Sequence, residues 1–400
     1  MHEIRSRPGF GGLLRATGPR DVRRAASDAP LLYLSAGPTD GVALVVQRGV
    51  GVKAHWLRKL SRRSVAKRYK SLRKAYDRRH ADASAWPTAL DQVTGWLGER
   101  LLSPLLDELA LHQRVRVVAT GQLGLLPLHA AWVTDDSMPT GRRYALDQWV
   151  LSYAMNARAV SFTRRATRRP ADDVLVVDDP HPAGHAPLLP WSGVETAAVC
   201  GSLPRSEVLT GDRANRKEVL ERIAAHPVVH LSCHSRSEPT QPLDSALMLA
   251  DGMLRLRELL DLRLPAARLI VLSACETAVA GSDLPDEVIS LAAGLVQAGA
   301  AGVVASAWAV PELETALLMA RFYTNWALDP ATPAEALREA QQWIRDTTND
   351  EKCAYLRNGD HGRLPAEVAR QLWRAYALEE PDERGLANPA MWASFALIGD

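Results

Sequence analysis

Short apolar runs alternate with amphipathic stretches along the second half of the sequence. The apolar runs predict strands, and stretches with apolar residues at steps of three or four predict helices. The predicted strands are 174–177, 228–232, 269–273 and 302–307, with a hairpin at 246–254, and the predicted helices are 193–203, 215–225, 255–260, 286–298, 315–327 and 333–347. Strands that are apolar on both faces and alternate with helices form parallel sheets covered on both sides. The pattern therefore predicts an α/β fold with a largely parallel sheet between helices.

The first half of the sequence has a different order of elements. Apolar runs at 31–36 and 42–47 flank the turn-forming sequence Gly-Pro-Thr-Asp-Gly and predict a β-hairpin. Two helices, at 57–80 and 87–111, and a strand at 115–119 follow. These elements predict a mixed α/β unit ahead of the parallel one.

A polar segment separates the two halves. Residues 164–173 contain four arginines, two aspartates and a proline without any period, which is typical of a link between folded units. Residues 1–30 also lack a sustained period. We therefore predict a lead-in segment (1–30), a first half (31–165) and a second half (170–400).

Charge is distributed unevenly between the two ends of the chain. The net charge of +2 divides into +14 over residues 1–80 and −12 over residues 81–400. The predicted helix at 57–80 carries eleven Lys and Arg residues beside an apolar stripe that includes Tyr69 and Tyr76. Since it has no further aromatic residues for stacking on bases, we expect a solvated face or a docking surface for an acidic protein partner, and not a nucleic-acid site.

Composition narrows the class of protein. An apolar content of 47% with 24% charged residues is ordinary for a globular protein and excludes a disordered or fibrous chain. Only four cysteines occur in 400 residues, without a charged-then-apolar leader, which favours a reducing compartment and the cytoplasm. The uncharged segment 288–311 is interrupted by Gln297 and several glycines, so we predict a buried helix and strand and no membrane span.

Two predicted strands of the second half lead into reactive side chains. The strand at 228–232 is followed closely by His234, and the strand at 269–273 by Cys275. Catalytic groups gather at the carboxyl ends of parallel strands, and neighbouring strands lie roughly 4.8 Å apart. A thiol is mostly protonated at neutral pH, so a neighbouring imidazole must take its proton. These residues predict a Cys–His dyad; the alternative is a buried, inert Cys275 and an ordinary loop histidine.

Two other groups of residues suggest a metal site. His230, Cys233 and His234 are close in sequence, but side chains alternate along a strand, so the three do not converge. Asp178 and Asp179 end a predicted strand without a third carboxylate nearby. We therefore predict no metal and no cofactor.

Several sequence blocks resemble one family. They are Val-Val-His-Leu-Ser-Cys-His, ending at His234; Leu-Ile-Val-Leu-Ser-Ala-Cys-Glu-Thr, containing Cys275; Ala-Gly-Ala-Ala-Gly-Val-Val-Ala-Ser-Ala-Trp, ending at Trp308; and Asn-Pro-Ala-Met-Trp-Ala-Ser-Phe-Ala-Leu-Ile-Gly at 388–399. Blocks beginning at Pro8, Val117 and Trp149 extend the resemblance over nearly the whole sequence. Together they are similar to the CHAT family, caspase- and separase-like cysteine peptidases that are often fused to tetratricopeptide repeats.

The resemblance implies roles for individual residues. Cys275 corresponds to the nucleophile and His234 to the general base and acid, in a caspase-like second half preceded by a related, catalytically silent half. The backbone amides of Ser235 and Cys275 correspond to the oxyanion site. The family usually has glycine where this sequence has Ser235, so the amide remains but the close backbone approach of glycine is not assured.

Three further residues are candidates for substrate binding. Asp244 lies on a polar loop between the dyad residues, and Trp308 ends the last core strand. Glu312 lies near the position where the family usually has an aspartate. The alternatives are a turn residue for Asp244 and core packing for Trp308. Glu276, beside the nucleophile, either orients the start of a helix or repels substrate carboxylates.

These observations predict a cysteine endopeptidase that cleaves a protein partner. By analogy with the family, we expect it to be held inactive by a regulatory or sensor protein, either a tetratricopeptide-repeat protein or an acidic partner on residues 57–80. The same analogy suggests a role in bacterial defence, including defence against viruses, or in regulated cell death. The alternative is a catalytically weak or inactive adaptor that keeps the fold and binds a partner.

Overall fold

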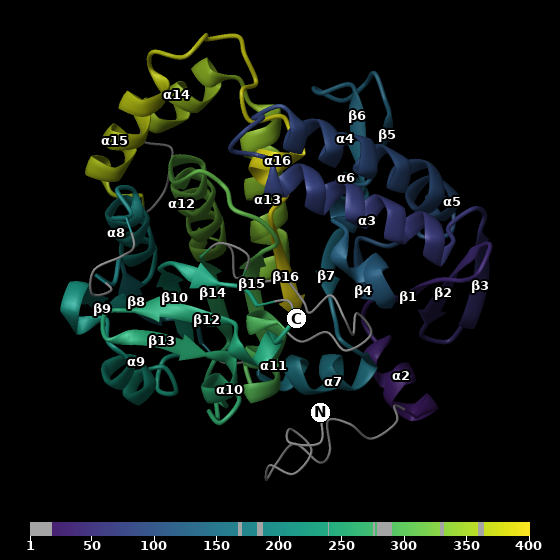
Figure 1. The fold of residues 1–400 in the computed structure, drawn as a ribbon, viewed down its shortest axis with the longest axis horizontal. Coiled ribbons are helices and arrows are strands. Elements are labelled where there is room, and N and C mark those ends of the chain that lie inside the picture. The colour runs from purple at the N-terminus through teal and green to yellow at the C-terminus, as the bar shows by residue number, and fades with distance from the viewer. Residues whose placement is uncertain are drawn as a thin grey trace.

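The computed structural model describes residues 18–166, 170–181, 187–238, 240–274, 277, 290–328, 332–358 and 364–400. Within these residues the centre is one eleven-stranded sheet, in the order β3-β2-β1-β4-β7-β16-β15-β14-β10-β8-β9, with helices around it (Figure 1). Its strands are β1 (Leu31–Ala36), β2 (Gly41–Gln47), β3 (Gly51–Leu57), β4 (Arg114–Ala119), β7 (Val150–Tyr153), β8 (Asp173–Asp178), β9 (Arg205–Thr210), β10 (Val228–Ser232), β14 (Leu269–Ser273), β15 (Gly302–Ser306) and β16 (Phe395–Gly399).

Two small sheets accompany the large one: β5 (Trp132–Thr134) pairs with β6 (Arg142–Tyr144), and β11 (Ser235–Arg236) pairs with β12 (Ala246–Leu249) and β13 (Gly252–Arg255). The α-helices are α2 (Pro19–Ala25), α3 (Arg62–Asp77), α4 (Ala85–Leu97), α5 (Ser103–Leu105), α6 (Ala145–Gln148), α7 (Ala157–Ala166), α8 (Ser192–Ser202), α9 (Arg216–Arg222), α10 (Leu256–Leu259), α11 (Leu291–Ala298), α12 (Glu312–Leu328), α13 (Pro333–Asp346), α14 (Asn349–Asn358), α15 (Ala366–Tyr376) and α16 (Pro389–Trp392). Among the described helices, none is both long enough and apolar enough to cross a membrane.

The parallel sheet predicted for the second half is confirmed. Strands β8, β10, β14 and β15 are parallel neighbours, and β12 and β13 form the predicted hairpin. The prediction omits β9, which lies parallel beside β8 at the edge of the sheet, and β16, which lies antiparallel beside β15. β9 is half exposed and carries Arg205 and Glu207, so no apolar run identifies it.

Successive residues of the central strands face opposite layers of helices. Val174 and Val176 of β8 belong to the core that includes residues of α8, α12 and α13. Leu175 and Val177 belong to the core that includes residues of α9, α10 and α11. This is the arrangement predicted from strands that are apolar on both faces, and it leaves the carboxyl ends of the strands as the place for polar groups.

The first half adds five strands to the same sheet. β1 and β2 form the predicted antiparallel hairpin, β3 extends it, and β4 and β7 lie parallel to β1 and to each other. The helix predicted over 57–80 is shorter, because Leu57 ends β3 and α3 begins only at Arg62. The Ser61 hydroxyl fixes that start by accepting a hydrogen bond from the Ser64 amide.

The second helix of the first half also differs from its prediction over 87–111. Its α-helical part, α4, begins at Ala85 and ends at Leu97. A π-helical turn (Gly98–Leu102) and the short α5 follow, so helical structure ends at Leu105. Leu109 is still fully buried, whereas Leu111 is almost fully exposed. The apolar spacing beyond Leu105 is therefore that of a packed turn and not of a continuing helix.

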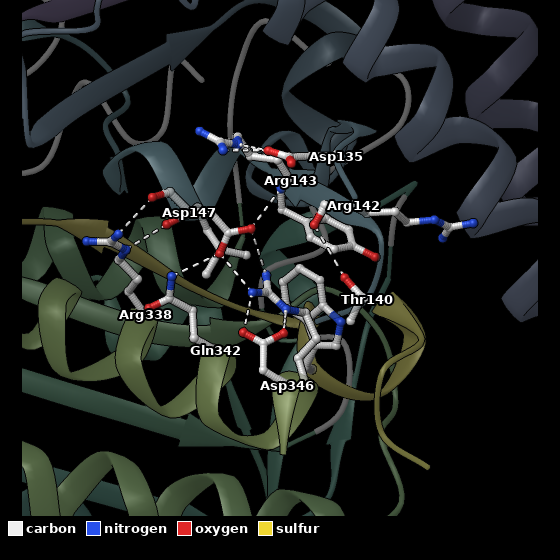
Figure 2. Close-up of polar contacts among 12 residues, drawn as sticks. Asp135, Thr140, Arg142, Arg143, Asp147, Arg338, Gln342 and Asp346 are labelled. Atoms are coloured by element: carbon white, nitrogen blue, oxygen red, sulfur yellow. Dashed lines mark hydrogen bonds and ion pairs between the residues drawn. The ribbon is translucent and has the colours of Figure 1, made fainter. Parts of the chain in front are cut away.

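The two halves are joined by strand pairing and by a buried ionic cluster. β16 pairs in parallel with β7, and α13 lies against α6 (Figure 2). Arg345 of α13, which is fully buried, contacts Asp147 of α6 at 2.8 Å and also pairs with Asp346. Gln342 donates to the same Asp147 carboxylate, and Arg338 donates to the Asp147 carbonyl, both at 2.9 Å. Residues 338, 342 and 345 share one face of α13, so one helix face fixes the first half against the second.

Candidate active site

The carboxyl ends of β10 and β14 lie side by side. The two strands are parallel and in register, with Ser232 opposite Ser273. Cys233 and His234 follow β10, and Ala274 follows β14. Cys275 and Glu276 lie outside the described residues. The structure thus places His234 just beyond the end of β10 and beside the end of β14, which lies two residues before the predicted nucleophile.

The hydrogen bonds around His234 define which nitrogen can act as a base. Its Nε2 lies 2.8 Å from the carbonyl oxygen of Pro187, which can only accept, so Nε2 carries a hydrogen and, in the neutral imidazole, Nδ1 holds the lone pair. The backbone of His234 is held in turn, since its carbonyl accepts from the Met248 amide at 2.8 Å. In this tautomer of the half-buried ring, Nδ1 is the nitrogen that can serve as a base.

The residues on either side of the undescribed pair 275–276 are both anchored to β15. The Ser306 hydroxyl donates to the Ala274 carbonyl at 2.7 Å, and the Ser306 amide donates to the Thr277 hydroxyl at 3.1 Å. Thr277 also donates to the Ala274 carbonyl at 3.3 Å. All three residues are buried. This small network holds the chain immediately before and after Cys275 and Glu276.

A cavity of about 260 Å³ opens beside His234. Its lining includes Ser232, Ser273, Ser306, Trp308, Glu195 and Glu312. Glu312 accepts a hydrogen bond from the Trp191 amide at 3.2 Å. Burial raises the pKa of the Glu312 carboxyl, and the nearby His234 opposes part of that rise. The described lining of this cavity therefore contains two carboxylates and no Lys or Arg side chain.

A buried polar cluster lies behind the cavity. His230 is 0% exposed, its Nε2 lies 3.2 Å from a Glu195 carboxylate oxygen, and its Nδ1 lies 3.1 Å from the Tyr323 hydroxyl. The Ser232 hydroxyl donates to the other Glu195 oxygen at 3.2 Å. His230 is hydrogen-bonded through Nδ1 and lies at ion-pair distance from Glu195 through Nε2, and it does not line the cavity. Of the two histidines of β10 and its end, only His234 faces the site.

Comparisons with known proteins identify the family. The model of the CHAT domain matches residues 91–400. The chain belongs to the CHAT domain family. No curated protein sequence matches it.

The fold of this CHAT domain is similar to those of solved cysteine peptidases. Separase of Saccharomyces cerevisiae, in a crystal structure of the separase–securin complex, aligns with a TM-score of 0.58 at 9% identity over 95% of this chain and 30% of the separase chain. The Arg-specific cysteine proteinase gingipain R aligns with a TM-score of 0.43 at 9% identity over 78% of this chain and 67% of its own. The chain therefore spans about a third of the length of separase. The resemblance inferred from the sequence blocks is confirmed, and the CHAT domain has the mostly parallel sheet of a caspase-like cysteine peptidase.

The other residues expected at the site fall in different places. Trp308 and Glu312 line the cavity. Ser235 begins β11 and pairs with Leu247. Asp244 pairs with Arg257 and is not among the residues that line the cavity, so its role in substrate binding stays a prediction.

Sequence reasoning missed three residues of this site: Glu195, Ser306 and Thr277. Glu195 lies in a helix of small residues, Ser-Gly-Val-Glu-Thr-Ala-Ala, and becomes buried only because α8 packs against α12. Ser306 and Thr277 carry no distinctive sequence signal. Their contacts arise because β15 lies beside β14 in the sheet. The sequence signal available for Ser306 was its place at the carboxyl end of a predicted strand.

The metal alternative can be tested on the described residues. Cys233 is 2% exposed and belongs to the core beneath α9, α10 and α11, whereas His230 belongs to the cluster on the other face. Among the residues that the structure describes, no group of three His, Cys, Asp or Glu side chains is placed to hold a metal ion. Cys233 is therefore a thiol packed in the core.

Proposed function

We propose that this CHAT domain is a cysteine endopeptidase in which His234 and Cys275 form the catalytic dyad. The observation that carries the proposal is the placement of His234, with its Nδ1 as the basic nitrogen, at the carboxyl end of the strand beside the one that leads into Cys275. Membership of the CHAT family and the caspase-like sheet support it. A cavity of about 260 Å³ beside His234 supplies room for a substrate side chain.

The reaction would follow the chemistry of a thiol and an imidazole. His234 takes the Cys275 proton on Nδ1, and the thiolate attacks the peptide carbonyl. The backbone amides of Ser235 and Cys275 would donate to the oxygen as it becomes negative. His234 then gives the proton to the leaving amine, and water hydrolyses the thioester with His234 again as the base. The Ser306 contacts to Ala274 and Thr277 would hold the nucleophile's strand end during these steps.

The charge of the cavity favours a cationic side chain at the residue before the cleaved bond. Glu312 and Glu195 line it, and no Lys or Arg does so among the described residues. Glu195 is already engaged by His230 and Ser232, so Glu312 is the carboxylate that would meet the substrate. Trp308 would pack along the aliphatic part of the side chain. We therefore propose cleavage after arginine or lysine.

The target and the control of this activity are proposed by analogy. We propose that the substrate is a protein and that a regulatory or sensor protein holds the peptidase in check until a signal arrives. Separase was crystallised with securin, which supports the idea of control by a bound protein. A role in bacterial defence or regulated cell death rests on the family alone.

An adaptor without peptidase activity is the second candidate. The observation in its favour is Ser235, which stands where the family usually has glycine beside the catalytic histidine. In an adaptor the cavity would bind a side chain of the partner without cleaving it. Ser235→Gly separates the two ideas, because it should raise a rate that is limited by the oxyanion site and should leave pure binding unchanged.

The decisive experiment uses peptides of identical sequence that differ only in Arg, Leu or Asp before the scissile bond. We expect the wild type to cleave the Arg peptide, Cys275→Ala to be inactive, and His234→Ala to lose about 10²–10⁴ in rate. Cys353→Ala is the matched control, because it removes a buried thiol that does not line the cavity. Cleavage by Cys275→Ala would refute the assignment of the nucleophile. A wild type that neither cleaves nor reacts with a thiol-directed Arg peptide probe would favour the adaptor.

A further inference from the structure

A second cavity, of about 160 Å³, lies between the two halves of the molecule. Helices α3 and α4 pack side by side over one end of the sheet (Figure 1). Their side chains, including Tyr76 and Trp86, form one wall of the cavity. Residues at the ends of β4 and β7 and in β16 form another. Trp308 lines this cavity and also the catalytic one. The proposed catalytic mechanism uses no other residue of this second cavity.

The lining is mainly aromatic and aliphatic. Tyr76, Trp86 and Trp308 form a chain of edge-to-face contacts, with ring centroids 5.0 Å apart for the first pair and 5.4 Å for the second. Leu72 and Leu90 complete the helix side. An apolar cavity of roughly 150 Å³ is large enough to hold one benzene ring. The size and the ring-lined wall therefore fit a small planar molecule.

Most polar groups in this lining already have partners. His129 contacts the Tyr153 hydroxyl and the Ala393 carbonyl, each at 2.9 Å, and burial lowers its pKa to about 4, so it is neutral at physiological pH. The Trp308 indole N–H donates to the Ala390 carbonyl at 2.9 Å. Arg73, the one Lys or Arg in the described lining, pairs with Asp77 at 3.6 Å. Nothing in the wall therefore requires a charged ligand.

Ser394 is the exception. It lines the cavity and is 1% exposed, yet its hydroxyl has no hydrogen-bond partner within the described structure. A buried hydroxyl without a hydrogen-bond partner destabilises the folded state, and such hydroxyls are rare in native proteins. A ligand with a single N–H or O–H group would satisfy it.

We propose that this cavity binds a small aromatic molecule that carries one hydrogen-bonding group, of the phenol or indole class, with its ring among Tyr76, Trp86 and Trp308 and its polar group on Ser394. The aromatic wall supplies the edge-to-face contacts that such a ring prefers. The ligand is a free small molecule, because a cavity of about 160 Å³ holds only one small aromatic molecule.

The test measures binding of phenol, indole and toluene by the shift in melting temperature and by quenching of tryptophan fluorescence. Wild-type protein should bind phenol and indole more tightly than toluene, which lacks the hydrogen-bonding group. Ser394→Ala should weaken phenol binding about five- to tenfold and leave toluene binding unchanged. Neither readout requires turnover, so failure of the peptidase proposal would not affect the result.

A cavity-filling variant provides the control for location. Ala119 lines the cavity and is half-buried, so Ala119→Leu should abolish binding of all three compounds. Ala110→Leu, at an exposed position that does not line the cavity, should bind as the wild type does. The proposal is overturned if millimolar phenol and indole leave the wild type unchanged. It is equally overturned if binding persists in Ala119→Leu, or if phenol binds equally well without the Ser394 hydroxyl.

Discussion

The Ser306 hydroxyl donates a hydrogen bond of 2.7 Å to the carbonyl of Ala274, the residue that immediately precedes the proposed nucleophile. Ser306 ends β15 and Ala274 follows β14, so the bond joins the ends of two neighbouring strands. Through its amide, Ser306 also holds Thr277. One serine therefore fixes the chain before and after the reactive position, which suggests a positioning role.

Ser306→Ala should lower kcat for an Arg peptide about tenfold or more while leaving KM nearly unchanged, because a misplaced nucleophile slows chemistry without removing substrate contacts. The matched control is Ser202→Ala, whose buried hydroxyl donates to Ala198 within α8 at 2.9 Å, far along the chain from the dyad. Both variants should lose about 1 kcal/mol of stability by urea unfolding. Equal kcat values for the two variants would contradict a positioning role for Ser306.

Removing one member of the buried Glu195–His230 pair should destabilise the fold, because the other member is left in the core without its partner. Glu195→Ala leaves His230 and the Ser232 hydroxyl without their carboxylate, and breaking such a pair costs about 3 kcal/mol. Glu195→Gln keeps the shape and should cost about 1 kcal/mol. Urea unfolding measures both, with the exposed Glu221→Ala as a control expected to remain within about 0.5 kcal/mol of the wild type. A Glu195→Ala midpoint equal to that of the wild type would contradict the expectation.

His129 should make stability depend on pH. Burial lowers the pKa of its imidazole from 6.5 to about 4, so the folded state stays neutral where the unfolded state already binds a proton. The unfolded state thus binds more protons between pH 6.5 and 4, and the free energy of unfolding falls as pH falls through that window. The loss at pH 4 should be about 3 kcal/mol.

Urea unfolding of wild type and His129→Gln at several pH values checks this expectation. The difference between the two curves isolates His129 from other titrating groups. The wild type should lose more stability than the variant between pH 6.5 and 4, and the curves should run parallel above pH 7. Parallel curves throughout would show that His129 titrates alike in both states.

The sequence predicts the part of the fold that is apolar on both faces. β10 and β14 have the predicted bounds, because a strand buried between two helix layers is marked by an unbroken apolar run. The edge strand β9 has no such run, and α3 begins later than its apolar spacing indicates because Ser61 caps it. Local pattern therefore identifies the centre of the sheet better than its edges.

The sequence predicts those residues of the candidate site whose polar or aromatic side chains come just after a strand. His234 and Trp308 belong to this group, and both line the cavity. Glu195 was not predictable, because its burial depends on the packing of α8 against α12, which residues far apart in the sequence decide. Asp244 is the opposite case: its sequence position made it a candidate for substrate binding, but its carboxylate pairs with Arg257 of α10.

Glu312 should make the preference for arginine depend on pH. Burial raises the pKa of its carboxyl above the ordinary value of 4.5, so it loses its charge at a higher pH than an exposed glutamate does. The ratio of kcat/KM for the Arg peptide to that for the Leu peptide should therefore fall as pH falls through this raised pKa. Taking the ratio cancels any pH dependence of the catalytic step that the two peptides share. Glu312→Gln should show a low ratio at every pH, and a preference that survives in Glu312→Gln would rule out this carboxylate as the specificity group.

The basic face of α3 should bind acidic protein and not nucleic acid. Arg62, Arg63, Lys67 and Lys70 are exposed, whereas Val65, Leu72 and Tyr76 hold the helix to the core. Replacing the four cations by glutamate should therefore abolish binding of poly-glutamate, used as an acidic probe, while cleavage of a short Arg peptide stays unchanged, because the substitutions leave the buried face intact. Arg370→Glu with Arg374→Glu, on the exposed face of α15, should bind the probe as the wild type does.

The same helix provides the contrast with nucleic acid. Phosphate contacts release counterions, so an oligonucleotide held by α3 would bind with an affinity that falls steeply as salt rises. We expect no retention of single-stranded or duplex 20-mers at physiological ionic strength in a fluorescence anisotropy titration. A micromolar complex under these conditions that disappears with the four reversals would overturn the assignment to an acidic protein, and would make the first half of the chain a nucleic-acid sensor joined through Arg345 and Asp147 to the half that carries His234.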